Sequence, residues 1–516
     1  MVLHLDYRDI LPNDSEPLRR RHVHFNFLTV PLIGVLFLLV VQAVGGDVVR
    51  KGILGTDGVH PIDIMALFIS LAYIAISLDA TGLLRFLAFW VARKGGSSGP
   101  RLYFLLYVFF LFCGVVVGND PVILSGTAFL AYLTRISGIT PPTAWIFSQF
   151  TAANMASAVL VSSNPTNLVL SGAFSLSFIT YTSSLILPFL AAALVVYPFM
   201  AFILFRSNEL IPPSIDLPEE GEAGAASVNN PRAALIDKGG AIFGGVLLLV
   251  TLGILVGTSI VGVPVWQVTV PPAVIMLCRD AWHDWSIYRA TQLDAKTTGN
   301  ASSTIDRNTG TNIAAELLPT YPPIQLQSEL TTLASLLSHP TSRFIKTFPT
   351  VHAVTQRLPI ALIPFAFLMF ILVQSLASKG WVEVFAGWWQ AWVEKTGLVG
   401  AVVGMVFASG LLCNVCGTNI GTTILLARTL QVWDAASHPS VRLRYGSIYA
   451  LAIGSNYGAF TATFSASLAG LLWRDILRQK GIHVRRGQFA KLNAGTFVVA
   501  CLASAAVLVG QALVVH

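Results

Sequence analysis

The sequence is poor in charged residues. Asp, Glu, Lys and Arg make up 11% of its 516 residues, whereas a typical soluble domain carries roughly 25%. Apolar residues make up 54%, and the mean hydropathy is +0.70. This composition excludes an ordinary soluble protein and indicates a chain that crosses a membrane many times. Because each span needs about 20 apolar residues, the sequence has room for roughly ten to twelve spans.

Cysteines and catalytic motifs are also sparse. The five cysteines are scattered, mostly within apolar runs, so they do not form the disulfide framework of a small secreted domain. No glycine-rich stretch is followed by the Lys-Ser/Thr pair of a phosphate-binding loop, and no nucleophile, base and orienting group occur together. These absences argue against an enzyme, against a bound cofactor and against transport driven by nucleotide hydrolysis.

The alternation of polar and apolar segments divides the chain into six parts. They are a polar tail at 1–24, a first membrane repeat at 25–205, a polar linker at 206–238, spans at 239–278 that open a second repeat, a long, mostly disordered polar loop at 279–357, and the remainder of the second repeat at 358–516. The expected spans cover 25–44, 62–78, 102–117, 181–205, 241–260, 263–277, 360–376, 398–412 and 493–514. Arg19, Arg20 and Arg21 precede the first span, which favours a cytoplasmic N-terminus.

Three polar clusters interrupt the apolar stretch between Val115 and Pro188. They lie around Gly118, at 151–154 and at 162–167. Unpaired polar groups that face lipid are costly, and broken backbone at membrane depth occurs only in a protein interior or beside a water-filled cavity. This stretch therefore predicts half of a transport site. Its candidate residues are Asn119, Asp120, Asn154, Ser162, Ser163, Asn164, Thr166 and Asn167.

The second half of the chain repeats this order. An apolar span ends in a Gly/Asn break at 413–421, a short apolar arm follows, and a second polar cluster lies at 454–467. Two halves that each hold a broken hairpin and a broken helix predict an all-α polytopic membrane protein, an inverted-repeat secondary transporter with two re-entrant hairpins. The candidate residues of this half are Asn414, Gly417, Thr418, Asn419, Ser455, Asn456, Thr461 and Thr463.

The inverted repeat also predicts which segments meet. The two hairpins should enter from opposite sides of the membrane, so we expect Asn119 and Asn414 to lie near each other, with Asn164 and Asn456 close by. The hairpins would then belong to a moving transport unit. The spans that begin at Phe25 and Ala241 would form a scaffold.

Both halves resemble the ion transporter superfamily, and most closely the bacterial arsenite efflux permeases. The similar motifs are Gly-Asn-Asp at 118–120, Ser-Asn-Pro-Thr-Asn-Leu-Val at 163–169, Gly-Ser-Asn-Tyr-Gly at 454–458 and Ser-Leu-Ala-Gly-Leu-Leu-Trp at 467–473. At 413–419 the permeases have paired asparagines followed by a proline, whereas this chain reads Cys-Asn-Val-Cys-Gly-Thr-Asn. That sequence and Ser-Asn-Pro-Thr-Asn at 163–167 are also similar to the Ser-Asn-Thr signatures of sodium-coupled dicarboxylate carriers. The resemblance implies a homodimer. Relatives in the same superfamily carry sodium and protons, dicarboxylates, citrate or silicic acid.

The residue types of the candidate site suit a small oxygen-rich solute. Asn and Thr side chains, together with amides freed at helix breaks, can bind an oxyanion or a neutral hydroxyacid by hydrogen bonds, and half-helix N-termini add positive dipole. The same oxygens could hold Na⁺, whereas coupling to H⁺ needs a titratable group. Asp120 fits either that coupling role or a structural cap of the hairpin arm. Cys413 and Cys416 could ligate a thiophilic metalloid, although apolar filling is the commoner role of such cysteines.

We therefore expect a multi-pass secondary active transporter of a plasma or vacuolar membrane. Its predicted substrate is a small inorganic oxyanion or oxyacid, similar to arsenite, antimonite or silicic acid, moved by an ion gradient or the membrane potential through an elevator-type motion. A Na⁺- or H⁺-coupled carrier of citrate or dicarboxylates is the first alternative. A non-transporting scaffold that binds partners through the long polar loop is the second. Nucleic acid is not expected as a partner.

Overall fold

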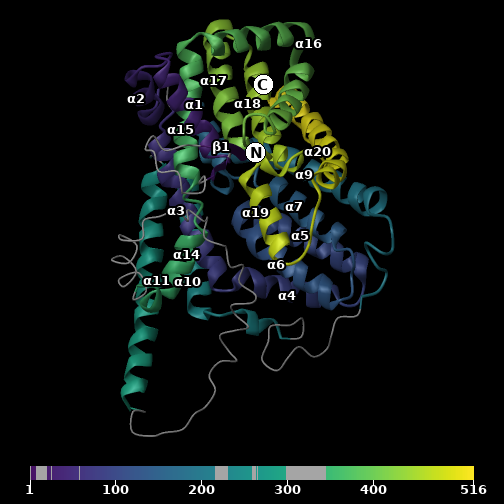
Figure 1. Cartoon of the computed structure of the whole chain (residues 1–516). Coiled ribbons are helices and arrows are strands. Elements are labelled where there is room, and N and C mark those ends of the chain that lie inside the picture. Colours follow the sequence, from purple (N-terminus) through teal and green to yellow (C-terminus); the bar gives the residue numbers. More distant parts are fainter. Residues whose placement is uncertain are drawn as a thin grey trace.

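The computed structural model of the protein describes residues 2–6, 20–24, 26–56, 59–215, 230–258, 263, 265–297 and 344–515. Apart from one two-stranded hairpin, the named elements of these ranges are helices (Figure 1). Seven of the described helices are long and apolar enough to cross a membrane, and shorter or broken helices connect them. The predicted helical, polytopic fold is confirmed.

The first repeat follows the expected order, with two differences at its start. Strands β1 (Val2–Asp6) and β2 (Arg20–His24) pair antiparallel in the polar tail, which the sequence did not predict. Helix α1 (Thr29–Val40) is shorter than the expected span, because the chain turns at Gln42, whose φ is 57°. The other elements are α2 (Gly46–Leu54), α3 (Pro61–Ala80), α4 (Leu83–Gly95), α5 (Gly99–Val116), α6 (Asn119–Ile136), α7 (Thr143–Ala156), η1 (Val161–Ser163), α8 (Pro165–Ala173), α9 (Phe178–Pro198) and its continuation η2 (Phe199–Leu204).

The second repeat begins after a short 3-10 turn, η3 (Pro231–Ala234). Its helix α16 (Trp381–Leu412) consists of two helices that meet at Gly397. The other elements are α10 (Lys238–Thr258), α11 (Val265–Thr297), α14 (Pro349–Arg357), α15 (Leu362–Ser378), α17 (Asn419–Ser437), α18 (Val441–Tyr457), η5 (Gly458–Phe460), η6 (Phe464–Ala466), α19 (Leu468–Gln479) and α20 (Arg486–Val515).

The predicted start of the polar loop at Arg279 is wrong. Helix α11 runs through this residue to Thr297, and α14 occupies the last part of the expected loop. Some of the polar side chains here are buried between helices. Asp280 accepts hydrogen bonds from Ser77 and Tyr73 of α3. This polar residue therefore lies in the interface between α11 and α3 and does not mark a disordered loop. The central part of the loop, including Asn300, and residues 216–229 of the linker lie outside the described residues.

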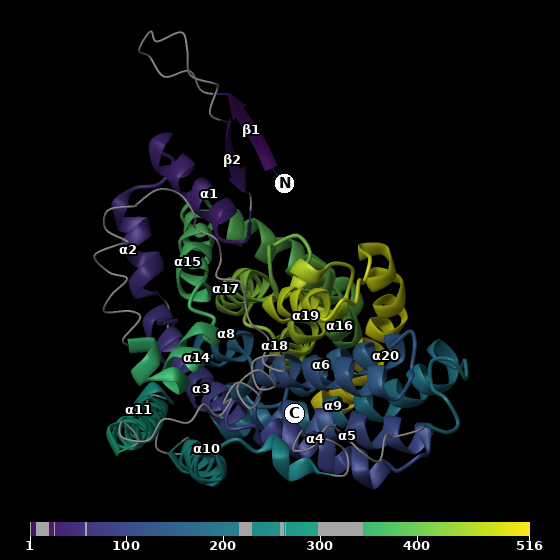
Figure 2. The ribbon, with the colours of Figure 1, turned by 60° about the horizontal axis from the view of Figure 1, so that its bottom comes forward.

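The helices form two units that lie side by side (Figure 2). The scaffold consists of α1, α2, α3, α10, α11, α14 and α15, and α3 packs on α11 while α15 packs on α1 and α2. The transport unit consists of α5 to α9 and α16 to α20. Within it the repeats interlock, since α8 packs against α17 and α19 packs against α6. Contacts of α3 with α6 and α8, and of α15 with α17, join the two units.

The element order shows that the repeats have inverted topology. The hairpin α5–α6 enters from the end of the molecule that carries α4, and the hairpin α16–α17 enters from the opposite end (Figure 1). We call the end that carries α4 the basic face, because the helix ends gathered there are rich in Lys and Arg. They include Arg93, Lys94, Arg101, Lys238, Arg478, Lys480, Arg485 and Arg486.

Glycine breaks recur at matching positions of the two repeats. Gly82 before α4 has φ 85° and ψ 7°, and Gly380 before α16 has φ 77° and ψ 7°. Gly96 after α4 has φ 62° and ψ −152°, and Gly397 inside α16 has φ 63° and ψ −156°. Only glycine adopts these conformations without strain. Helix α4 and the first half of α16 are therefore counterparts, each a short arm between a scaffold helix and a hairpin.

Candidate functional site

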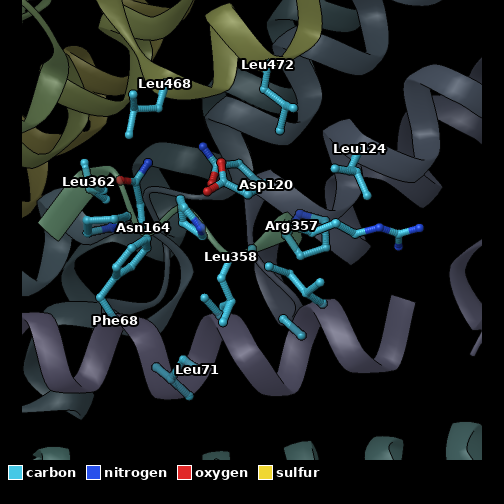
Figure 3. Close-up of a pocket in the computed structure, with 18 of the residues that line it drawn as sticks. Phe68, Leu71, Asp120, Leu124, Asn164, Arg357, Leu358, Leu362, Leu468 and Leu472 are labelled. Atoms are coloured by element: carbon cyan, nitrogen blue, oxygen red, sulfur yellow. The ribbon is translucent and has the colours of Figure 1, made fainter. Parts of the chain in front are cut away.

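A cavity of about 950 Å³ lies between the scaffold and the transport unit (Figure 3). Its apolar wall comes from α3, with Phe68 and Leu71, from Leu358, which follows α14, and from Leu362, which starts α15. Its polar end is formed by the breaks of the first repeat. The polar lining residues are Asn119, Asp120, Ser162, Ser163, Asn164, Thr355, Gln356, Arg357, Asp475, Arg478 and Gln479.

The break at Gly118 places the start of α6 in this cavity. Gly118 has φ 97°, and a Cβ there would lie 3.0 Å from the carbonyl oxygen of Ser163. The turn therefore brings the hairpin tip against the break between α7 and α8. Asn119 is 5% exposed and donates from Nδ2 to Oδ1 of Asn154 at 3.3 Å. Asp120 faces the cavity, and its carboxylate accepts no hydrogen bond from the residues that the structure describes.

Asn164 organises the break before α8. Its Oδ1 caps the helix by accepting from the backbone N–H of Thr166 at 3.1 Å and from the hydroxyl of Thr166 at 3.0 Å. Its Nδ2 lies 3.4 Å from Oγ of Ser157. Asn167 donates to the carbonyl oxygens of Ser157 and Leu160 at 2.6 and 2.7 Å. These bonds satisfy the carbonyls that the helix break leaves free.

Two hydrogen bonds join the breaks of the two repeats. Asn456 donates from Nδ2 to Oδ1 of Asn167 at 2.7 Å, and Ser157 donates from Oγ to Oδ1 of Asn456 at 3.0 Å. The three side chains are buried. Ser157 was not among the predicted site residues, because a serine in a run of small residues carries no signal of its contact partners. The structure thus brings Asn154, Asn164, Asn167 and Asn456 into one core behind the cavity.

The break of the second repeat forms a separate polar cluster. Asn414 donates to Oγ1 of Thr461 at 2.8 Å and accepts from the backbone N–H and the hydroxyl of Thr463 at 3.0 and 2.9 Å. Thr418 caps α17, with its Oγ1 3.5 Å from the N–H of Gly421. The remaining predicted residues of this half are Gly417, with φ 84°, Asn419, the first residue of α17, and Ser455, which is buried in α18.

None of these second-repeat residues lines the cavity described above. Asn119 and Asn414 hydrogen-bond to different partners, Asn154 in one case and Thr461 and Thr463 in the other. The predicted approach of the two asparagines stays a prediction. A cysteine pair at these positions, bridged by a short bifunctional thiol reagent, would measure it.

Three helix N-termini converge on the cavity. Asn119 and Asp120 start α6, Pro165 starts α8 and Leu468 starts α19, and all four residues line the cavity wall. Each N-terminus carries a positive partial charge. At α8 and α19 the side chains of Asn164 and Ser467 already accept from the backbone N–H groups of Thr166 and Gly470. The arrangement can therefore bind electron-rich oxygen atoms of a small solute.

The two cysteines of the Cys-x-x-Cys motif differ in exposure. Cys413 is fully buried and donates from Sγ to the carbonyl oxygen of Ser409 at 3.1 Å, whereas Cys416 is partly exposed. Within the described residues, no group of three or more His, Cys, Asp or Glu side chains is placed to hold a metal ion.

The sequence did not predict the ion pair of Arg357 with Asp79, which is described below. The two residues are 278 positions apart, so no local sequence pattern indicates their contact.

Comparison with known families agrees with this architecture. The family model described as citrate transporter matches residues 23–295, more than half of the chain. The chain belongs to this family, within the ion transporter superfamily. A second model, described as arsenical pump membrane protein, matches residues 342–512 of the transporter.

The curated relatives point in the same direction. An arsenical pump membrane protein of Escherichia coli is 23% identical over 426 residues, covering 82% of this transporter and 80% of the relative. The protein of the same name from strain K12 is 24% identical over 446 residues, covering 84% and 85%. Among solved structures, the YdaH transporter of Alcanivorax borkumensis matches 98% of this chain and 93% of its own, with a TM-score of 0.51 and 15% identity. This last likeness shows the fold alone.

Proposed function

We propose that this secondary transporter moves a small uncharged oxyacid, of the kind represented by arsenous, antimonous and silicic acid, from the basic face across the membrane. The observation that carries the proposal is the composition of the cavity's polar end. Amide and hydroxyl groups and three helix N-termini surround an Asp120 carboxylate that has no partner among the described residues. Beside Asp120 such a site offers hydrogen bonds to hydroxyl groups without a free cation, because Arg357, which also lines the cavity, pairs with Asp79.

The charge of the site argues against a polyanion. An ionised Asp120 would repel a carboxylate that approached the same helix N-termini, and this repulsion is strong where water is excluded. Arg357 does not offset it, because its guanidinium extends away from Asp120 (Figure 3) and pairs with Asp79 at 3.5 Å. Arg478 is exposed at the mouth of the cavity, about 15 Å along α19 from Leu468. Arsenous and silicic acid are uncharged near neutral pH and escape this repulsion.

A carboxylate carrier is the second candidate, and the citrate transporter model that matches the first repeat favours it. In that case a coupling cation would have to neutralise Asp120 before the substrate bound. Na⁺ held by the oxygens of the breaks, or H⁺ on Asp120, could serve. The two candidates therefore differ in whether substrate binding requires the cation.

We further propose that the transport unit slides along the scaffold, as an elevator, so that the site is exposed in turn to the two faces. The separation of the molecule into two units with a cavity between them supports this motion. A homodimer that joins two scaffolds would hold them still in the membrane, and the family resemblance supports that assembly.

Flux into proteoliposomes tests the proposal. Purified protein would be assayed with arsenite, antimonite, silicic acid, phosphate, citrate and succinate, with and without imposed Na⁺ and pH gradients. We expect saturable flux of the uncharged oxyacids and none of citrate or succinate. Gradient-driven citrate flux without oxyacid flux would establish the carboxylate alternative, and absence of all flux in folded protein would favour the non-transporting scaffold.

A further inference from the structure

A buried ionic cluster joins the two units at the basic face, beside the cavity. Asp79, in the last turn of α3, is 5% exposed. Ser125 of α6 donates its hydroxyl to Oδ1 of Asp79, and Nη1 of Arg357 lies 3.5 Å from Oδ2. Arg85 of α4 also interacts electrostatically with this carboxylate. Because α3 and α14 belong to the scaffold and α6 carries Asn119 and Asp120, Asp79 connects the scaffold directly to the hairpin of the site.

Arg357 is held in place by the rest of the scaffold. It is the last residue of α14, and the first turn of that helix is fixed by Asp284 of α11. The carboxylate of Asp284 accepts from the backbone N–H groups of Thr350 and Val351 at 2.8 and 3.2 Å. A carboxylate at a helix N-terminus is stabilised by the freed N–H groups and the helix dipole. Helix α14 is thus pinned at both ends, by Asp284 at its start and by Asp79 at its end.

The opposite end of the molecule has no such contact at the matching positions. Matching the equivalent glycines Gly82 and Gly380 puts Ala377 in the place of Asp79. Matching Gly118 and Gly417 puts Ile424 in the place of Ser125. Neither side chain can donate or accept a hydrogen bond. The inverted repeats therefore provide two similar arrangements of the units, but the ionic cluster is built for only one of them.

We propose that Asp79, Ser125 and Arg357 form a latch that stabilises the arrangement in which the cavity opens to the basic face. Sliding of α6 along α3 would remove the Ser125 hydroxyl from a buried carboxylate, and hydrogen bonds to charged groups are among the stronger ones in proteins. No equivalent bond forms at the matching positions of the other end to compensate. The latch rests on the proposed alternating access, and it makes Asp79 a positioning residue of the transport cycle rather than a group that touches the substrate.

The latch is tested by the accessibility of the opposite face. Ile424 is 4% exposed and lines a small cavity of about 40 Å³ between α15 and α17, so a thiol introduced there by Ile424→Cys reacts only when that face opens. The background would lack the five native cysteines. A membrane-impermeant maleimide would be applied from that face of reconstituted vesicles without any substrate. Adding Ser125→Ala should raise the labelling rate roughly tenfold, the equivalent of one lost hydrogen bond to a charge.

Ser77→Ala is the matched control. Ser77 also donates its hydroxyl to a buried carboxylate, that of Asp280 at 2.5 Å, but both residues belong to the scaffold. This variant should label at the parent rate while losing similar thermal stability.

Equal labelling of the Ser125→Ala and Ser77→Ala variants would overturn the latch. Absence of labelling in every variant would contradict the alternating access on which it rests. The readout needs no substrate, so an incorrect assignment of the transported solute leaves this test unaffected.

Discussion

At the scale of single residues, the site depends on which polar groups have partners. The side-chain amides of Asn154, Asn164, Asn167 and Asn456 are all hydrogen-bonded within the protein. Asn456 bonds to Asn167, Asn154 to Asn119, and Asn164 to Ser157 and Thr166, while Asn167 also bonds to two backbone carbonyls. They fix the shape of the site. The carboxylate of Asp120 accepts no hydrogen bond from the described residues and faces the cavity, so it is available to a proton, a cation or the substrate.

Replacement of Asp120 by Asn should abolish the pH dependence or ion coupling of flux while substrate binding remains measurable, because volume is nearly unchanged and only the titratable charge is lost. Proteoliposome flux measured against imposed pH and Na⁺ gradients gives the result. Asp475→Asn is the control, since Asp475 lines the same cavity but pairs with Arg474 at 2.9 Å. Coupled flux at the parent level in Asp120→Asn would show that the charge of Asp120 does not couple transport to an ion.

Asp237, just before α10, gives a prediction about stability and pH. Partial burial acts to raise the pKa of this carboxyl, but the N–H of Gly240 and the Arg279 guanidinium outweigh it, so its pKa lies below the ordinary value. A carboxyl group whose pKa is lowered by folding stabilises the folded protein at any pH above its pKa in the unfolded chain, about 3.9. This contribution is lost as the pH falls through the pKa of the same group in the folded protein.

The variant Asp237→Asn should therefore melt at a lower temperature than the parent at neutral pH. The difference should shrink as the pH falls below the unfolded value of about 3.9 and vanish once Asp237 is protonated in the folded protein. Thermal unfolding in detergent across this range measures it. Asp434→Asn, which breaks an exposed pair with Arg444 at 3.1 Å, should change little at any pH. A difference for Asp237→Asn that persists unchanged in acid would show that the charge is not its cause.

At the scale of elements, the sequence predicted most of the positions at which helices break, but few of the contacts between residues that lie far apart in the chain. Gly118, Asn164 and Gly417 were found because glycine, proline and amides stand out in apolar runs. The continuation of α11 past Arg279 was missed, because a polar helix that packs on α3 and α14 has the composition of a loop. The contact of Ser157 with Asn456 could not be predicted, since it joins positions 299 apart.

The glycine between the two halves of α16 provides a test of the arm helices. Gly397 has φ 63° and ψ −156°, and a Cβ added there would meet no other atom within 4 Å. Gly397→Ala should therefore destabilise the protein by about 1–3 kcal/mol through backbone strain alone. Gly387→Ala, inside the helix and equally open, should be neutral or stabilising by up to about 1 kcal/mol. Thermal unfolding of both variants measures the difference. Equal melting temperatures would contradict a break of the helix at Gly397.

At the scale of the whole molecule, the two repeats build one transport unit and one scaffold. The inverted order of the elements was predictable from the repeated breaks, but the site is less symmetric than the sequence suggested. The cavity reaches the first-repeat residues Asn119, Asp120 and Asn164, whereas Asn414 lies in a cluster with Thr461 and Thr463. This asymmetry supports the proposed alternating access, in which the site is open to one face at a time.

The most direct test of the proposed transport is arsenite flux in proteoliposomes by the parent protein and by the double variant Asn164→Ala with Asn414→Ala. These substitutions remove one organising amide from the break of each repeat. We predict saturable arsenite flux by the parent and loss of at least nine-tenths of it, on the order of 1.4 kcal/mol or more, in a variant that inserts and elutes as the parent does. Equal flux by parent and variant, or no flux by the parent while citrate is carried, would contradict this mechanism.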